Sequence, residues 1–293
     1  MSLKTKKTPP RNATMLQKSV WIVGICLILG FSVFMLTSQP AYAVRVSLKR
    51  VVFDESKRSE ILTIINTTAE PQTYRLGWRR YRMSGGKGLS VIKEGEDDSD
   101  ILWADDMIRF APRRVTIPPG GSQQIRLLLR RPANIQQAEY RSHLWIVSES
   151  KPAKFDAEPG NKKAMRLAVQ PAISLPVFVR HGDLKVETSI SNAQLKRSDK
   201  GLNVAFTLDR TGNRSIYGDF DFTCTNQGEE LILHQVRGIA VYTETNMRNL
   251  DFDIPLSENT AANCSSIKIT YRADPNDADF AGKTLAEATA TLQ

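Results

Sequence analysis

The side chains that most often carry out chemistry are sparse in this chain of 293 residues. Its three histidines, His143, His181 and His234, lie far apart and lack the spacing of metal ligands. The sequence contains no Gly-x-Ser-x-Gly nucleophile motif. His143 falls within an apolar stretch, so we expect it to have a structural role. We therefore predict that the protein is not an enzyme and holds no metal or other cofactor.

Two cysteines, Cys224 and Cys264, lie in the second half of the chain. A pair of cysteines in an exported protein suggests one disulfide, which would stabilise the fold by roughly 4 kcal/mol in the chain-entropy model. The alternative is two buried free thiols. Two cysteines alone do not build a structural zinc site. The third cysteine, Cys26, belongs to the N-terminal segment described next.

Residues 1–43 have the pattern of a secretory signal. They contain five basic and no acidic residues, then an apolar run over 20–36, and they end in Ala41-Tyr42-Ala43. A basic start, an apolar centre and a small-x-small end predict cleavage after Ala43. The alternative is an uncleaved membrane anchor, for which the apolar run is near the lower limit of length.

Much of the positive charge of the chain lies in this segment. Removing 43 of the 293 residues leaves 250, with 35 basic and 31 acidic side chains. The formal net charge therefore falls from +9 to +4. A balance this close to neutral gives no support for a nucleic-acid-binding protein.

The first half of the remaining chain reads as a series of short strands. Apolar and β-branched residues alternate with polar ones, and turns rich in glycine or proline separate the runs. Residues 84–100 have no apolar period and predict a long surface loop. The Gly-Gly-Lys-Gly sequence at 85–88 lacks the spacing of a phosphate-binding loop. Strands are expected over 44–53, 60–66, 72–83, 123–129 and 139–147.

The longest alternating stretch is 164–180, in which every odd position from Met165 to Val179 is apolar. This period of two predicts a long strand with one apolar face. Pro171 and Pro176 cannot donate a ladder hydrogen bond, so we expect an edge that is not paired on both sides throughout. A long apolar edge strand aggregates unless something pairs with it. The alternative is an ordinary strand that packs its own core.

A second set of strands follows 181–183, which we expect to be a hinge. The predicted runs are 184–187, 202–208, 217–223, 239–242 and 266–271, and 284–290 has either mild helical or strand character. The fold class is therefore all-β, with two immunoglobulin-like β-sandwich domains. We place the first domain at 44–180, including the long apolar strand, and the second at 181–293.

Four segments together resemble a known family. They are 46–53, Ile117-Pro-Pro-Gly-Gly-Ser-Gln-Gln-Ile-Arg126, Glu139-Tyr-Arg-Ser142 and the 210–219 segment of the second domain. They resemble the periplasmic pilus-assembly chaperones of the PapD-like family, and the 210–219 segment is similar to the archaic branch that serves spore-coat-U-like fimbriae. The resemblance implies an L-shaped arrangement of two sandwiches and export to the periplasm of a Gram-negative bacterium.

The resemblance also implies a mechanism. Such a chaperone lends its strand to a pilin subunit that lacks one, and the subunit then passes to an outer-membrane usher. The free chaperone is expected to cover its apolar strand, for example by self-association. The residues implied to form the donated face are Leu167, Val169, Pro171, Ile173 and Leu175.

Three charged residues match charged positions of the family. Arg50 matches the arginine that binds the terminal carboxylate of the subunit, a partner that suits the forked guanidinium group. Pro176 stands where the family has a second, lysine anchor, so the group that assists Arg50 is not identified. Glu139 and Arg180 match two members of an interdomain salt-bridge cluster, whose third, acidic member is not located.

A second class of protein fits the same pattern. A secreted adhesin or structural fimbrial protein would use similar sandwiches, but its edge strand would be permanently filled. Such a protein would bind a glycan or a surface, whereas a chaperone would bind unfinished subunits and stay out of the fibre.

Overall fold

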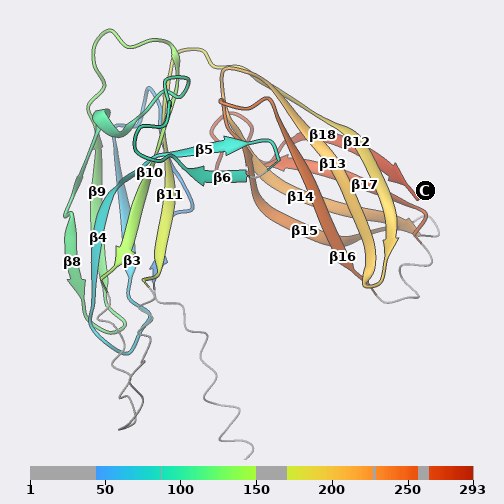
Figure 1. The fold of residues 1–293 in the computed structure, drawn as a ribbon, viewed down its shortest axis with the longest axis horizontal. Helices are drawn as coiled ribbons and strands as arrows, with labels where there is room; N and C mark the ends of the chain where they lie inside the picture. The colour runs from blue at the N-terminus through green and yellow to red at the C-terminus, as the bar shows by residue number, and fades with distance from the viewer. Residues whose placement is uncertain (1–43, 87, 150–169, 227–228, 257–263, 293) are drawn as a thin grey trace, which may run out of the picture. The chain divides into compact units, whose positions relative to one another are not determined.

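A computed structural model describes residues 44–86, 88–149, 170–226, 229–256 and 264–292, and the regular elements in these ranges are almost all β-strands (Figure 1). Their one helical element is the 3-10 turn η1 (Asp105–Met107). No helix within these ranges has the length and apolar character needed to cross a bilayer. The predicted all-β class is confirmed. The predicted signal sequence, 1–43, lies outside the described residues.

The first sandwich consists of two sheets that share one core. One sheet has the order β1-β3-β9-β7 and the other the order β2-β11-β10-β4-β8. The strands of the first sheet are β1 (Arg45–Val46), β3 (Ser59–Ile65), β9 (Ser122–Leu129) and β7 (Ile108–Ala111). Those of the second are β2 (Val51–Phe53), β11 (Ala172–His181), β10 (Ala138–Ser148), β4 (Gln72–Arg79) and β8 (Arg114–Ile117).

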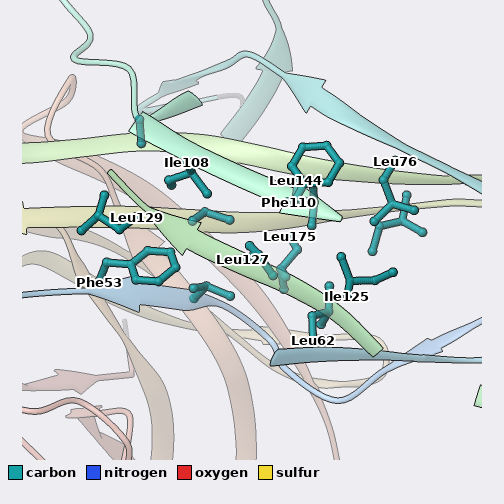
Figure 2. Close-up of a cluster of buried hydrophobic side chains, with 14 of the residues drawn as sticks. Phe53, Leu62, Leu76, Ile108, Phe110, Ile125, Leu127, Leu129, Leu144 and Leu175 are labelled. Carbon is teal, nitrogen blue, oxygen red and sulfur yellow. The ribbon is translucent and has the colours of Figure 1, made fainter. Parts of the chain in front are cut away.

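Alternation along the strands builds this core. On β9, Ile125 and Leu127 are buried, whereas Gln124 and Arg126 are exposed. Because successive side chains point to opposite faces of a strand, each such strand supplies one apolar face. Figure 2 shows side chains from both sheets meeting in this core. Each large aliphatic side chain buried here stabilises the fold by roughly 1.5–3 kcal/mol.

The prediction of one continuous strand over 44–53 is wrong. β1 pairs with β3, whereas β2 pairs with β11 in the other sheet. The chain therefore crosses from one sheet to the other between Val46 and Val51. Ser47 fixes the start of this crossing, because its backbone N–H donates to the Thr63 carbonyl and its hydroxyl accepts from the Thr63 N–H. Arg50 lies in the crossing segment.

The loop predicted over 84–100 is also wrong in part. The run expected as one strand over 72–83 divides into β4 and β5 (Tyr81–Ser84), and β5 forms an antiparallel hairpin with β6 (Gly88–Val91). β6 carries only two apolar side chains, Leu89 and Val91, and both are exposed. A strand this short with an exposed face gives no detectable alternation in the sequence.

The predicted edge character of β11 is confirmed for its described part. All of β11 pairs with β10, but on its other side only Val177, Phe178 and Val179 pair with β2. The half from Ala172 to Pro176 therefore has a ladder partner on one side only, among the described residues. Residues 164–169 of the predicted strand lie outside the described ranges.

The second sandwich is again two sheets around one core, which confirms the predicted pair of sandwiches. Its sheets have the orders β12-β13-β16 and β15-β14-β17-β18. Residues 284–290, for which the sequence left helix and strand open, belong to the strand β18. The strand β16 was not predicted. The strands are β12 (Val186–Ser198), β13 (Gly201–Gly212), β14 (Ile216–Asn226), β15 (Glu229–Val241), β16 (Met247–Pro255), β17 (Ser266–Ala273) and β18 (Thr284–Thr291).

The two cysteines join in this second core. Cys224, on β14, and Cys264, just before β17, form a disulfide with Cα atoms 6.0 Å apart. Both residues are buried in the apolar cluster of the sandwich. The disulfide, rather than the alternative of two free thiols, is therefore present.

Candidate functional site

Both sandwiches belong to one compact unit that runs from Ala43 to Gln293. Charged side chains from the two sandwiches meet within this unit in two clusters. We call the first the open cluster; it consists of Arg50, Glu139, Arg180, Arg214, Asp274 and Asp277. We call the second the closed cluster; it consists of Arg141, His143, Tyr242 and Glu244.

Arg50 enters the open cluster from the sheet-crossing segment. Its guanidinium Cζ lies 4.4 Å from the centre of the Tyr217 ring. Its Nη2 lies 3.7 Å from Asp274 Oδ1 and 3.6 Å from Asp277 Oδ2. These separations are long for hydrogen bonds, and no hydrogen bond from this guanidinium to another described residue is present. Arg50 is thus held by charge and by an aromatic face, and its guanidinium makes no hydrogen bond to the described residues.

Asp277 is the centre of the open cluster. It lies in the connection between β17 and β18, where its Oδ1 accepts hydrogen bonds from the backbone N–H groups of Asp279 and Phe280. Arg214 donates from one Nη to both carboxylate oxygens at 2.7 Å. Burial raises the pKa of the Asp277 carboxyl, but the hydrogen bond and charge of Arg214 and the charge of Arg180 bring it below its ordinary value.

Glu139 and Arg180 connect this centre to the first sandwich. They are directly opposite on β10 and β11, and Arg180 Nε donates to Glu139 Oε2 at 3.0 Å. Arg180 Nη1 also lies 3.8 Å from Asp277 Oδ2, and Glu139 Oε1 accepts the backbone N–H of Ser215. The structure therefore brings these two predicted residues together, with Asp277, a carboxylate of the second sandwich, beside them.

The 210–219 segment positions these contacts. Arg210 is buried, and its guanidinium donates to the carbonyl oxygens of Gly212, Arg214, Thr243 and Thr245. This fixes the turn from which Arg214 reaches Asp277. Burial lowers the pKa of Arg210, although the charges of Glu139 and Glu244 oppose that shift. Arg210 is thus a structural residue, whereas Arg214 belongs to the open cluster.

A cavity of about 1020 Å³ adjoins the open cluster. Its lining includes Arg50, Arg180 and Arg214, together with Asp274 and Asp277. Forked guanidinium groups at the wall of a cavity suit a carboxylate, with which they form two parallel hydrogen bonds. The described residues contain no group of three or more His, Cys, Asp or Glu that would hold a metal ion.

The closed cluster is centred on a buried salt bridge between Arg141 and Glu244. Arg141 Nη2 donates to Glu244 Oε1 at 2.6 Å and to the Tyr81 carbonyl at 3.0 Å. The side chains of Arg141 and Glu244 are 3% and 1% exposed. Arg141 also lies over the Tyr242 ring, 4.1 Å from its centre. Glu244 accepts the backbone N–H of Met83, so the β5–β6 hairpin is tied to the second sandwich.

His143 lies inside the closed cluster, as expected for a structural residue. Its side chain is buried against Tyr81, and its Nδ1 is 3.4 Å from Arg141 Nη1. Burial, and then the charge of Arg141, lower the pKa of His143 to about 3. The imidazole is therefore neutral at physiological pH.

Only some of the predicted donor residues belong to the described ranges. Leu167 and Val169 lie outside them. Pro171, directly before β11, and Ile173, on it, are half-buried, whereas Leu175 is 1% exposed in the core of the first sandwich. In this structure the apolar face of β11 thus turns inward at Leu175, and the surface part of the strand lies before it.

Several residues of the site were not found from the sequence. Asp274 and Asp277 belong to an Asp-Pro-Asn-Asp-Ala-Asp run that reads only as a polar turn. Tyr217 is one aromatic residue among several on predicted strands. Arg141 and Glu244 are 103 residues apart. The acidic run was the one local signal available, and it does not reveal which of its carboxylates is buried.

Comparison with solved structures finds proteins whose backbones align with most of this chain at low sequence identity. No protein-family model matches the sequence, and no curated protein matches it. The solved structure of the YadV chaperone is 14% identical, with a TM-score of 0.42, and the alignment covers 85% of this chain and 100% of that one. The CsuC–CsuE chaperone–tip adhesion subunit pre-assembly complex from archaic chaperone-usher Csu pili of Acinetobacter baumannii is 9% identical, with a TM-score of 0.45 and coverages of 85% and 99%.

A third similar structure is the Salmonella enterica SafA pilin in complex with the SafB chaperone. It is 13% identical, with a TM-score of 0.40, and the alignment covers 87% of this chain and 99% of that one.

Proposed function

We propose that this protein is a periplasmic chaperone of the PapD-like kind, of the archaic branch, which binds and caps pilin subunits by lending them a strand. The observation that carries the proposal is the state of Arg50. Its guanidinium faces a cavity and is held in place, yet it donates no hydrogen bond to another described residue. A subunit's terminal carboxylate supplies the acceptors that this group lacks.

The positive charge of Arg50 favours binding of a carboxylate over binding of a neutral ligand. Its side chain is only 9% exposed, so water screens it poorly and an added anion gains more than it would at an open surface. Its two acidic neighbours are more than 3.5 Å from its Nη2. They balance the charge without occupying the donors, which leaves the N–H edge for a two-pronged contact.

The edge of β11 supports strand donation. From Ala172 to Pro176 the strand has a free ladder side among the described residues, and the apolar alternation continues toward the N-terminus through Val169 and Leu167. An incoming subunit strand forms backbone hydrogen bonds along such an edge, and alternate side chains fill its groove. In this proposal Leu167, Val169, Pro171 and Ile173 are donated, and Leu175 marks the point where the strand returns to its own core.

The remaining expectations complete the proposal. Residues 1–43 direct export and are removed after Ala43, the folded chain works in the periplasm, and an outer-membrane usher receives the capped subunit. The two domains are 44–180 and 181–293. The free chaperone shields its apolar strand by self-association, since an uncovered edge invites aggregation.

The test is co-expression of the full chain with a pilin-like subunit encoded beside it, followed by purification of one-to-one complexes from the periplasm. Arg50→Ala should abolish the stable complex, whereas the control Arg126→Ala, an exposed arginine on β9, should not. Val169→Asp should also abolish it, whereas Gln170→Asp on the opposite face should leave it intact. A complex of normal yield with Arg50→Ala contradicts the proposal. Incorporation of the protein into the fibre would instead identify an adhesin or structural subunit.

A further inference from the structure

Among the described residues, the ring and the two carboxylates nearest the Arg50 guanidinium belong to the second sandwich. The first sandwich supplies the arginine from its sheet-crossing segment, but Tyr217 lies on β14, and Asp274 and Asp277 follow β17. Among these contacts only the Tyr217 ring lies directly against the guanidinium, with its centre 4.4 Å from Cζ. The ring is therefore the group best placed to restrict the orientation of the N–H donors.

Tyr217 is itself held firmly. Its backbone pairs with Ala240 on β15, and its carbonyl accepts the N–H of Asp274 at 3.2 Å. Its ring lies next to Gly238, where a Cβ atom would come within 3.0 Å of the hydroxyl oxygen. Gly238 has a φ of +78°, which favours glycine and so leaves room for the ring. Burial raises the pKa of Tyr217, and this keeps its hydroxyl neutral.

An aromatic face attracts a guanidinium and leaves its edge untouched. The attraction comes from the negative face of the ring and is stronger where water is excluded. A stacked guanidinium retains its in-plane N–H groups, and these are the groups that bind a carboxylate in two parallel hydrogen bonds. A long aliphatic side chain at the position of Tyr217 would fill space without fixing this plane.

We infer that Tyr217 is the positioning residue of the Arg50 anchor, which stacks on the guanidinium and presents its N–H edge to the carboxylate of the bound partner. This inference rests on the function proposed above. The anchor is then a composite of both sandwiches, since Arg50 acquires its orientation only from the second. Tyr217 thus assists Arg50 by positioning it rather than by adding a second positive charge.

The test measures the dissociation rate of the purified complex between the full chain and its co-expressed pilin-like subunit. Tyr217→Leu should raise this rate about 3- to 10-fold, the range expected for loss of a partly buried cation–π contact. Tyr217→Phe keeps the aromatic face and should stay within about 2-fold of wild type. Tyr217→Met serves as a second apolar variant if Tyr217→Leu does not fold.

Two further measurements separate positioning from a general structural role. In an Arg50→Lys background, which keeps the charge but not the planar group, Tyr217→Leu should change the rate by less than about 2-fold, because coupled residues are not additive. In the free protein, the Arg50 side-chain NMR signals should carry the ring-current shift of Tyr217. That shift should persist in Tyr217→Phe and vanish in Tyr217→Leu.

The outcomes distinguish the two proposals. Loss of the complex with Arg50→Ala but an unchanged dissociation rate with Tyr217→Leu and Tyr217→Met overturns the role of Tyr217 and leaves the chaperone function standing. An equal effect of Tyr217→Leu in the wild-type and Arg50→Lys backgrounds also overturns it. A complex that survives Arg50→Ala overturns the proposed function, and with it the partner of the anchor.

Discussion

Arg50 and Arg141 are two arginines of the first sandwich that both reach a carboxylate of the second, yet their surroundings differ. Arg141 donates to Glu244 at 2.6 Å and to a backbone carbonyl, and both partners are almost fully buried. Arg50 lies 3.6–3.7 Å from its carboxylates and lines a large cavity. Both guanidinium groups lie over a tyrosine ring.

Arg50 and Arg141 differ in whether their N–H groups donate hydrogen bonds within the protein. A buried arginine that donates to acceptors within the protein fixes the structure, and removal of its partner leaves an uncompensated buried charge. An arginine that is held in place without a hydrogen bond to the described residues is prepared for an acceptor from outside. The closed cluster is therefore expected to govern stability, and the open cluster, through Arg50, to govern binding.

The largest effect should come from the closed cluster. Glu244→Ala strands the charge of Arg141 and removes the acceptor of the Met83 N–H, so the free energy of unfolding should fall by about 3–5 kcal/mol. Urea denaturation of the full chain measures this loss. The control is Asp100→Ala, which breaks the more exposed pair with Arg82 on the same hairpin and should cost less than about 1 kcal/mol. Similar losses for both variants would remove the distinction between the clusters.

A smaller effect should appear as a pH dependence of the closed cluster. The pKa of His143 is about 3 in the folded protein and 6.5 for an ordinary histidine, so between these values the unfolded chain binds the extra proton. Stability should therefore fall as the pH drops below 6.5, by at most about 1.4 kcal/mol per pH unit. His143→Gln should flatten this slope, as measured by urea denaturation at several pH values between 4 and 7. Parallel curves for the two proteins would contradict the prediction.

The smallest effect should come from the open cluster. Asp274→Asn removes one carboxylate that competes for Arg50 but keeps the oxygen that accepts the Asn276 N–H. We expect the subunit complex to dissociate about 2- to 3-fold more slowly, because an ion pair at this separation is worth less than about 1 kcal/mol. Stability should not change. The control is Asp279→Asn in the same loop, where the carboxylate pairs with Arg214 instead of Arg50. Faster dissociation of Asp274→Asn would mean that this carboxylate orients Arg50 rather than competes with it.

The sequence by itself determined the all-β class, the two sandwiches and the edge character of β11. Alternation is a local property, because residues two positions apart share a face of a strand whatever else the chain does. Long alternating strands such as β9 and β10 were therefore predicted almost to their ends. The prolines at 171 and 176 predicted the edge character of β11 equally well, because each proline lacks a backbone N–H whatever the fold around it. Short strands such as β2 and β6 carry too few residues to show a period, and one of them was hidden in a predicted loop.

Tertiary structure alone decided the composition of the site. The sequence resemblance pointed to Arg50, Glu139 and Arg180, but not to the carboxylates or the ring around them. The partners of Arg50 lie at the far end of the chain, and those of Arg141 lie 103 residues away. Whether a carboxylate is buried against an arginine depends on which turns the two sandwiches bring together. Such contacts depend on packing between strands that are distant in the sequence, and no periodic pattern of neighbouring residues predicts them.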